Sequence, residues 1–104
     1  DEYILVDKSK LKPGFDYFIL RAEGDSMNQA GIQNGDLVLC RQQQKADTGD
    51  RVIALLGDNV TIKEYGAREN GVRMLLPRSS NPRHQAITPG DGDSVQGVVQ
   101  EVLE

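Results

Sequence analysis

The sequence predicts a small, mostly β domain, and two observations carry that prediction. Turn-forming pairs such as Pro13-Gly14, Asn34-Gly35 and Asn70-Gly71 punctuate the chain at short intervals. The segments between them are short apolar runs of strand length. Several short strands separated by closely spaced turns are typical of a small barrel or sandwich.

Six segments are expected to form strands, because each is apolar, rich in β-branched or aromatic residues, or both, and ends near a turn signal. In chain order they are residues 15–22, 36–41, 51–56, 59–65, 72–77 and 95–103. The third and fourth flank the turn Gly57-Asp58-Asn59, which predicts a hairpin. The last segment also has apolar residues at helical spacing, but its four valines and its internal glycine favour a strand.

Two further segments lack this strand pattern. Residues 24–32 contain no β-branched residue before Ile32 and suit one short helix, with Asp25 or Ser26 as its N-cap. Residues 77–85 are polar and contain two prolines, which indicates a loop.

Composition narrows the classes of function. The 104 residues are expected to form one domain over residues 1–104, and the net charge of −4 argues against a nucleic-acid surface. One cysteine and one histidine exclude an internal disulfide and any site that needs two imidazoles. The longest apolar run, residues 52–56, is far shorter than a membrane span. We therefore expect no membrane partner, no metal and no cofactor, and the first residue, Asp1, suggests a processed product or an excised domain.

Three other candidate sites are better explained without catalysis or metal binding. His84 lies in the polar loop and is more typical of a solvated side chain than of a Ser-His-Asp triad. Cys40 alternates within an apolar strand and is interpreted as a small buried hydrophobe. Asp91 and Asp93 indicate a metal loop only weakly, because no glutamate follows at the EF-hand position.

The segment Gly24-Asp25-Ser26-Met27 is the most informative one. A strand ends in a glycine turn that brings Ser26 to the start of the expected helix, with the backbone amides of Ser26 and Met27 free to face an oxyanion. By geometry alone, an N-capping serine or aspartate is the more frequent explanation. A nucleophilic serine needs a base, and Lys63 differs from the other four lysines because it lies inside an expected strand. It would be solvent-facing unless both faces of that strand are covered.

At these residues the chain resembles a known family. The segments FILRAEGDSMNQAGIQNGDLVLCR, GDRVIALLGDNVTIKEY and VRMLLPRSSNP are similar to the C-terminal domain of LexA-type repressors, a family of self-cleaving Ser-Lys peptidases that includes UmuD-like proteins and phage repressors. The similarity runs from residue 15 to residue 103, and the motifs GDSM, AGI-x-x-GD, A-x-x-GD, T-x-K and L-x-P occur in family order.

The resemblance implies a mostly β fold with a short helix carrying the nucleophile, Ser26 as nucleophile and Lys63 as general base. It further implies a bacterial or phage-encoded cytoplasmic homodimer that cleaves its own N-terminal segment in the SOS response to DNA damage, with an activated RecA filament as trigger. DNA would be bound only through an N-terminal domain outside this chain. Family members cut an Ala-Gly or Cys-Gly bond upstream of the serine, and no such bond precedes Ser26 here.

Residues 78–84 also depart from the family, with His84 near the usual aromatic. Two alternatives remain open at this point: a UmuD-like polymerase accessory protein, and a catalytically silent dimerisation module of a repressor. A signal peptidase, which also uses a Ser-Lys pair, would need a membrane anchor, and none is evident in the sequence.

Overall fold

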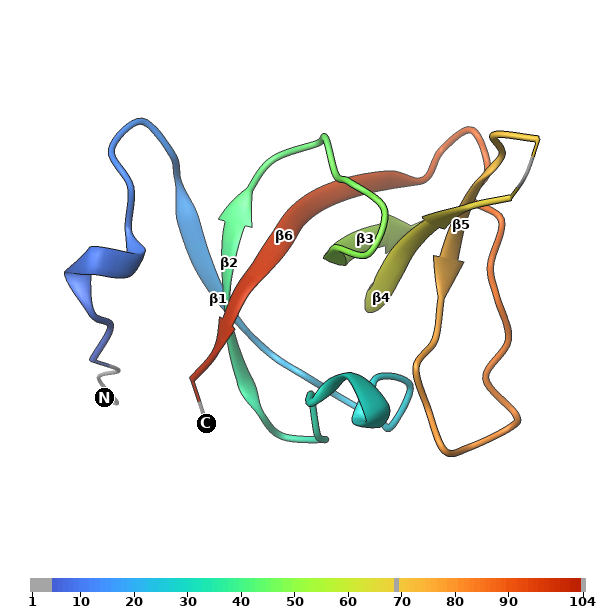
Figure 1. The fold of residues 1–104 in the computed structure, drawn as a ribbon, viewed down its shortest axis with the longest axis horizontal. Coiled ribbons are helices and arrows are strands. Elements are labelled where there is room, and N and C mark those ends of the chain that lie inside the picture. Colours follow the sequence, from blue (N-terminus) through green and yellow to red (C-terminus); the bar gives the residue numbers. More distant parts are fainter. Residues whose placement is uncertain (1–4, 69, 104) are drawn as a thin grey trace.

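The structure, a computed structural model, describes residues 5–68 and 70–103. Its architecture is a single six-stranded antiparallel sheet in the order β1-β2-β6-β3-β4-β5 (Figure 1). The strands are β1 (Tyr17–Arg21), β2 (Leu37–Gln42), β3 (Arg51–Leu56), β4 (Asn59–Ala67), β5 (Arg73–Leu76) and β6 (Ser94–Val102). The mostly β prediction is confirmed, and each expected strand is present with ends shifted by at most two residues.

The hairpin of β3 and β4 forms at the turn that the sequence indicates. Leu56 pairs with Asn59, which leaves Gly57 and Asp58 as a two-residue loop. Gly57 has a φ of 60°, the positive value that a type II′ turn requires at its first loop position. This turn fixes the register of β4 and therefore places Lys63 opposite Val52.

The short helix differs from the expectation. It is one turn of 3-10 helix, η2 (Asn28–Ala30), and its N-cap is Met27, which makes no side-chain capping hydrogen bond. Gly31, with a φ of 82°, ends the turn in the left-handed region. Ser26 therefore precedes the helix rather than lying on it, and neither Asp25 nor Ser26 is the cap. A second 3-10 turn, η1 (Lys8–Lys10), lies near the N-terminus. Neither of these turns, the only helices of the described residues, could cross a membrane.

The last strand occupies the middle of the sheet. β6 pairs with β2 on one side and β3 on the other (Figure 1). The expectation that residues 95–103 offer a free sheet edge is wrong for the first half of the strand, because Ser94, Val95, Gly97 and Val98 pair with β3. Beyond Val98, the described ladders pair β6 only with β2, as far as Val102. The valine-rich sequence indicates a buried strand. A strand that is buried on both faces of the sheet is typically a central strand.

Apolar side chains cover both faces of the sheet at β3. Val52, Ile53 and Ala54 are each at most 2% exposed. Ile53 packs in a cluster with Met27, Ile32, Val38 and Ile62, whereas Val52 and Ala54 pack on the other face with Leu75, Val95 and Val98. In the neighbouring strand β4, Ile62, Lys63 and Gly66 are buried, and Lys63 is only 7% exposed. Lys63 therefore does not face solvent, as it would if its side of the strand were uncovered.

Gly97 is expected to tolerate no side chain. A Cβ built there would lie 2.8 Å from the Arg41 carbonyl oxygen and 2.9 Å from the Phe18 ring, and the backbone oxygen cannot retreat. We expect Gly97→Ala to lower the free energy of unfolding by about 1–3 kcal/mol through overpacking. Urea denaturation measures this, with Gly92→Ala as the matched control, since a Cβ there meets no atom within 4 Å. Equal stability of the two variants would contradict the prediction.

Candidate active site

Ser26 lies in the connection between β1 and β2. The chain leaves β1, turns at Gly24 with a φ of 81°, and reaches Ser26 just before η2. Ala22 and Met27 are buried on either side of this turn, with 6% and 3% of their surface exposed. Because the two anchors belong to one core cluster, the segment between them is held at a fixed position with the half-buried Ser26 at its tip.

Lys63 reaches Ser26 from β4. Its Nζ lies 2.9 Å from Ser26 Oγ, 2.5 Å from Thr61 Oγ1 and 3.1 Å from the Ile62 carbonyl oxygen. No carboxylate is among these hydrogen-bond partners. Burial lowers the pKa of Lys63 from its ordinary value, because the charged ammonium loses its hydration. The structure thus brings together the two residues that the sequence singles out.

The three partners of Lys63 match the needs of both protonation states. An ammonium donates three hydrogen bonds, one to each of the three oxygens. A neutral amine has two N–H donors and one lone pair. With Thr61 Oγ1 and the Ile62 carbonyl taking the two donors, the lone pair is left for the Ser26 hydroxyl, which then donates its proton toward Nζ. The arrangement is therefore suited to taking a proton from Ser26.

The backbone amides of Ser26 and Met27 are unengaged by any other described residue. In the same turn, the Ser26 carbonyl accepts a hydrogen bond from the Arg78 amide at 2.8 Å, and the Met27 carbonyl accepts from the amides of Ala30 and Ile32. The carbonyls are thus satisfied while the two amides are left available. Unpaired amides beside a nucleophile are the donors that an oxyanion requires.

A groove of about 260 Å³ opens in front of Ser26. Its floor includes the buried side chains of Ala22, Met27, Ile32 and Ile62, and its rim includes Arg21 and Glu23. Lys63 is not among the lining residues, so the amine lies behind the serine rather than in the groove. The apolar side chains of this floor are suited to contact with a short uncharged side chain.

Strand edges border this groove on two sides. β5 pairs with β4 only at Glu64–Ala67, so the part of β4 from Asn59 to Lys63 has an open edge within the described sheet. β1 is the terminal strand, and its end contributes Leu20 and Arg21 to the groove wall. Open edges offer backbone donors and acceptors to an extended peptide.

The remaining candidates have other surroundings. His84 is not simply solvated, because its Nε2 lies 2.5 Å from Asp25 Oδ1. Cys40 is fully buried, and burial raises the pKa of its thiol to about 12, as expected of a small hydrophobe. The Asp93 carboxylate accepts hydrogen bonds from the amides of Gly57 and Gly90, which gives it a structural role. Within residues 5–68 and 70–103, no cluster of three or more potential metal ligands occurs.

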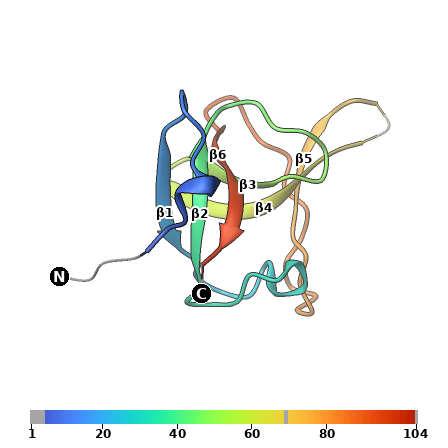
Figure 2. The same cartoon turned by 60° about the vertical axis from the view of Figure 1, so that its left-hand side comes forward.

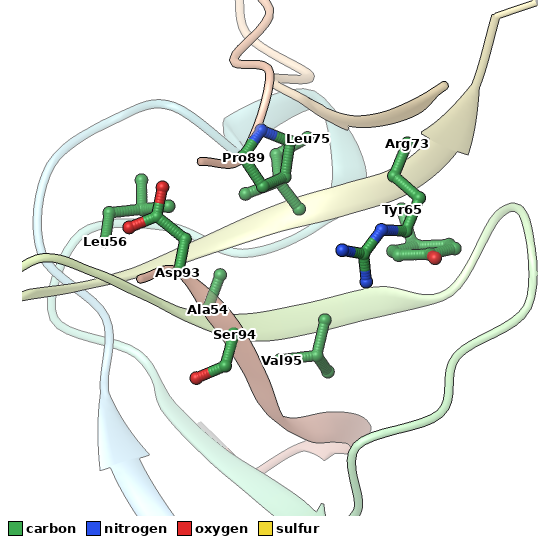
Figure 3. A pocket seen from close by; sticks show the side chains of 9 residues that line it. All are labelled: Ala54, Leu56, Tyr65, Arg73, Leu75, Pro89, Asp93, Ser94 and Val95. Atoms are coloured by element: carbon green, nitrogen blue, oxygen red, sulfur yellow. The ribbon is translucent and has the colours of Figure 1, made fainter. Parts of the chain in front are cut away.

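A second depression lies apart from Ser26 and Lys63. Figure 3 shows Arg73 and Asp93 on opposite sides of it, around the apolar side chains of Ala54, Leu56, Leu75, Pro89 and Val95. Its enclosed space is about 10 Å³, room for roughly one water molecule. It is a packing irregularity of the second core cluster and too small for a ligand.

The sequence does not predict a set of contacts that residues 78–84 make with the turn that carries Ser26. Besides the Arg78 amide, Ser79 Oγ donates to the Asp25 carbonyl at 2.6 Å, and the Asn28 side chain exchanges hydrogen bonds with Ser80. These partners are separated by more than 50 residues, and no local signal in the sequence points to them. The departure from the family pattern in this loop is the one hint it contains.

Known proteins are similar to this chain over most of its length. A Peptidase S24-like family model matches residues 1–100. The LexA repressor of Geotalea uraniireducens is 40% identical over 84% of this chain, LexA repressor 1 of Geobacter sulfurreducens 38% over 89%, and the LexA repressor of Thermobifida fusca 44% over 83%. The aligned regions cover 40%, 45% and 32% of these relatives, so the chain spans less than half of their length. On the strength of the family match and these identities, the chain belongs to the Peptidase S24-like family as a LexA-like domain.

Proposed function

We propose that this domain is a self-cleaving serine peptidase with Ser26 as nucleophile and Lys63 as general base, in a cytoplasmic LexA-like repressor of the SOS response. One observation carries the proposal: the buried Lys63 amine lies 2.9 Å from Ser26 Oγ. A lysine on a strand has no structural reason to be buried without a carboxylate, since burial of a charge is costly. Burial favours the neutral amine, and a neutral amine beside the Ser26 hydroxyl can accept its proton.

In the first half of the reaction, Ser26 Oγ attacks the carbonyl carbon of the residue before a glycine. The hydroxyl proton passes to Lys63 Nζ, and the carbonyl oxygen becomes an oxyanion held by the amides of Ser26 and Met27. When the peptide bond breaks, the Lys63 ammonium returns its proton to the leaving amine. The product is an ester between the serine and the N-terminal fragment.

In the second half, the neutral Lys63 takes a proton from a water molecule, which attacks the ester carbonyl. The same two amides hold the second oxyanion. Lys63 then returns the proton to Ser26 Oγ as the ester bond breaks. Lysine is thus the only acid and base that the cycle needs.

The substrate is an N-terminal segment of the same polypeptide, lying in the groove as an extended strand. Backbone pairing with the open edge of β4 would hold it, and the apolar floor would take the small residue before the scissile bond. Tethering gives the segment a high effective concentration, so a weakly activated nucleophile suffices. Cleavage then depends on how often the segment occupies the groove, and an activated RecA filament would favour that state.

We also propose that the domain forms a homodimer through the end of β6. Beyond Val98 this strand lacks a partner on the β3 side among the described residues, and residues 100–103 are half-buried. Two such ends can pair about a two-fold axis by backbone and apolar contacts. DNA would be bound by an N-terminal domain of each protomer, consistent with the acidic charge of this one.

The dimer makes a measurable prediction. Leu103→Asp places a carboxylate in the proposed apolar contact, and we expect the dissociation constant to rise at least about tenfold because that charge would be desolvated. Sedimentation equilibrium across micromolar concentrations reads the constant. Gln96→Asp, on the exposed surface of the same strand, is the matched control and should leave it unchanged. A wild-type protein that is monomeric at about 50 μM, weaker than a specific dimer needs, would contradict the proposal.

The test of the peptidase function restores a substrate to the domain. An N-terminal extension with an Ala-Gly bond, taken from one of the LexA repressor relatives, is joined ahead of Asp1, and cleavage is followed by gel electrophoresis and mass spectrometry. We expect two fragments that meet at the Ala-Gly bond, formed at a rate independent of protein concentration. A chimaera that stays intact at alkaline pH while Ser26 and Lys63 are unmodified would overturn the proposal.

A further inference from the structure

The loop of residues 78–84, here the clamp loop, spans both halves of the candidate active site. It follows β5 and runs alongside the nucleophile's turn and η2, as Figure 2 shows in orange and teal. At its start, the Arg78 guanidinium forms an ion pair with Glu64, the neighbour of Lys63 on β4. The Arg78 backbone meanwhile donates to the Ser26 carbonyl. One residue therefore contacts the strand of the base and the segment of the nucleophile.

The far end of the clamp loop contacts the residue before the nucleophile. His84 Nε2 lies 2.5 Å from Asp25 Oδ1, and Asn81 Nδ2 donates to Asp25 Oδ2 at 3.2 Å. An ionised carboxylate only accepts hydrogen bonds, so His84 carries a proton on Nε2 in this contact. The same contact, with that to Asn81, lowers the pKa of Asp25 and keeps it ionised.

His84 and Asp25 do not complete a catalytic triad. The Ser26 hydroxyl is bonded to Lys63, whereas the imidazole donates to the carboxylate of the adjacent residue. In a triad the histidine lies between serine and carboxylate and bonds to both. Here His84 has no hydrogen bond with Ser26 among the described contacts, so it takes no proton from the nucleophile.

We propose that the Asp25–His84 pair is a latch that closes the clamp loop over the nucleophile's turn and so holds Ser26 Oγ against Lys63. This inference rests on the proposed peptidase function, and both residues are positioning residues. The loop has few apolar anchors of its own, since most of its side chains are polar and half or fully exposed. Hydrogen bonds therefore decide its position: Arg78, Ser79 and Ser80 fasten its first half, and the Asp25–His84 pair fastens its far end. A shift of about 1 Å in a nucleophile is enough to slow a reaction up to 100-fold.

His84→Ala removes the latch, and His84→Gln restores a donor near the position of Nε2. In the self-cleaving chimaera we expect His84→Ala to slow cleavage about tenfold, as loss of a charge-assisted hydrogen bond allows. His84→Gln should recover most of the rate. Arg83→Ala changes an exposed side chain of the same loop and is the matched control.

Amide hydrogen exchange, measured by NMR in the Ser26→Ala background, tests the latch without cleavage. The Arg78 amide reports the clamp directly, because it is bonded to the carbonyl of residue 26. We expect His84→Ala to accelerate its exchange about tenfold and His84→Gln to reverse the change, while the Ile53 amide in the core is unaffected. A general loss of stability would accelerate both amides.

The outcomes separate the two proposals. If His84→Ala leaves both the Arg78 exchange and the cleavage rate unchanged, or if glutamine fails to restore either of them, the latch is wrong even though the wild type cleaves. If the wild type fails to cleave, the peptidase proposal falls, and the exchange of the Arg78 amide still decides whether Asp25 and His84 fasten the loop.

Discussion

Replacing Lys63 by alanine is expected to slow self-cleavage near neutral pH by about 10²- to 10⁴-fold, the usual contribution of a general base. Without the amine, no described group bonded to Ser26 Oγ accepts its proton. Ser26→Ala removes the nucleophile and should abolish cleavage at every pH. Rates come from the fraction of intact chimaera over time.

Two further lysine variants make this result specific. Lys63→Arg should be as slow as Lys63→Ala, because a guanidinium stays protonated and cannot act as a base. Lys45→Ala, in an exposed loop, is the matched control and should cleave like the wild type. Retained cleavage in Lys63→Ala would show that the hydrogen bond to Ser26 has a structural role only.

The pH dependence of cleavage is expected to be the second large effect. Only the neutral amine accepts the serine proton, so below the pKa of Lys63 the rate should rise about tenfold for each pH unit. Burial lowers this pKa from its ordinary value, so the rate should level off at a lower pH than an exposed lysine, with a pKa of about 10.4, would give. Single-turnover rates across the alkaline range measure the curve.

The same group should change stability with pH. Between the lowered pKa of folded Lys63 and the ordinary pKa of the unfolded chain, the unfolded state binds more protons, so the free energy of unfolding rises with pH in that window. Urea denaturation of the Ser26→Ala protein, which cannot cleave, isolates this effect, and Lys63→Met should remove it.

For the cleavage reaction itself, a rate that falls as pH rises through the same window would contradict Lys63 as the general base.

The strands could be predicted because their signals are local. Gly57 and the other turn residues mark where each strand ends. The apolar runs between these turns are as long as typical strands, so the strand bounds follow from them. The position of β6 inside the sheet could not be predicted in this way. Its valines show that the strand is buried, but whether it lies between β2 and β3 depends on pairings with residues 39 to 64 positions earlier in the chain.

For the site, the sequence supplies Ser26 and Lys63 but not their surroundings. The resemblance assigns their roles, and the structure adds the 2.9 Å contact and the burial of Lys63. The interpretation of His84 as a solvated side chain is wrong because its partner, Asp25, is 59 residues away in the chain. Contacts of that range leave no periodic pattern in the sequence.

The central place of β6 has a consequence for when the domain becomes active during its synthesis. Within the described residues, the strands next to Ser26, β1 and β2, join β3 and the Lys63-bearing strand β4 in one sheet only through β6. Until the ribosome has released this last strand, the two halves have no shared ladder to hold nucleophile and base together. On the proposed peptidase function, nascent chains would thereby be protected from cutting themselves, because Ser26 and Lys63 come together only once β6 is available to join the two halves.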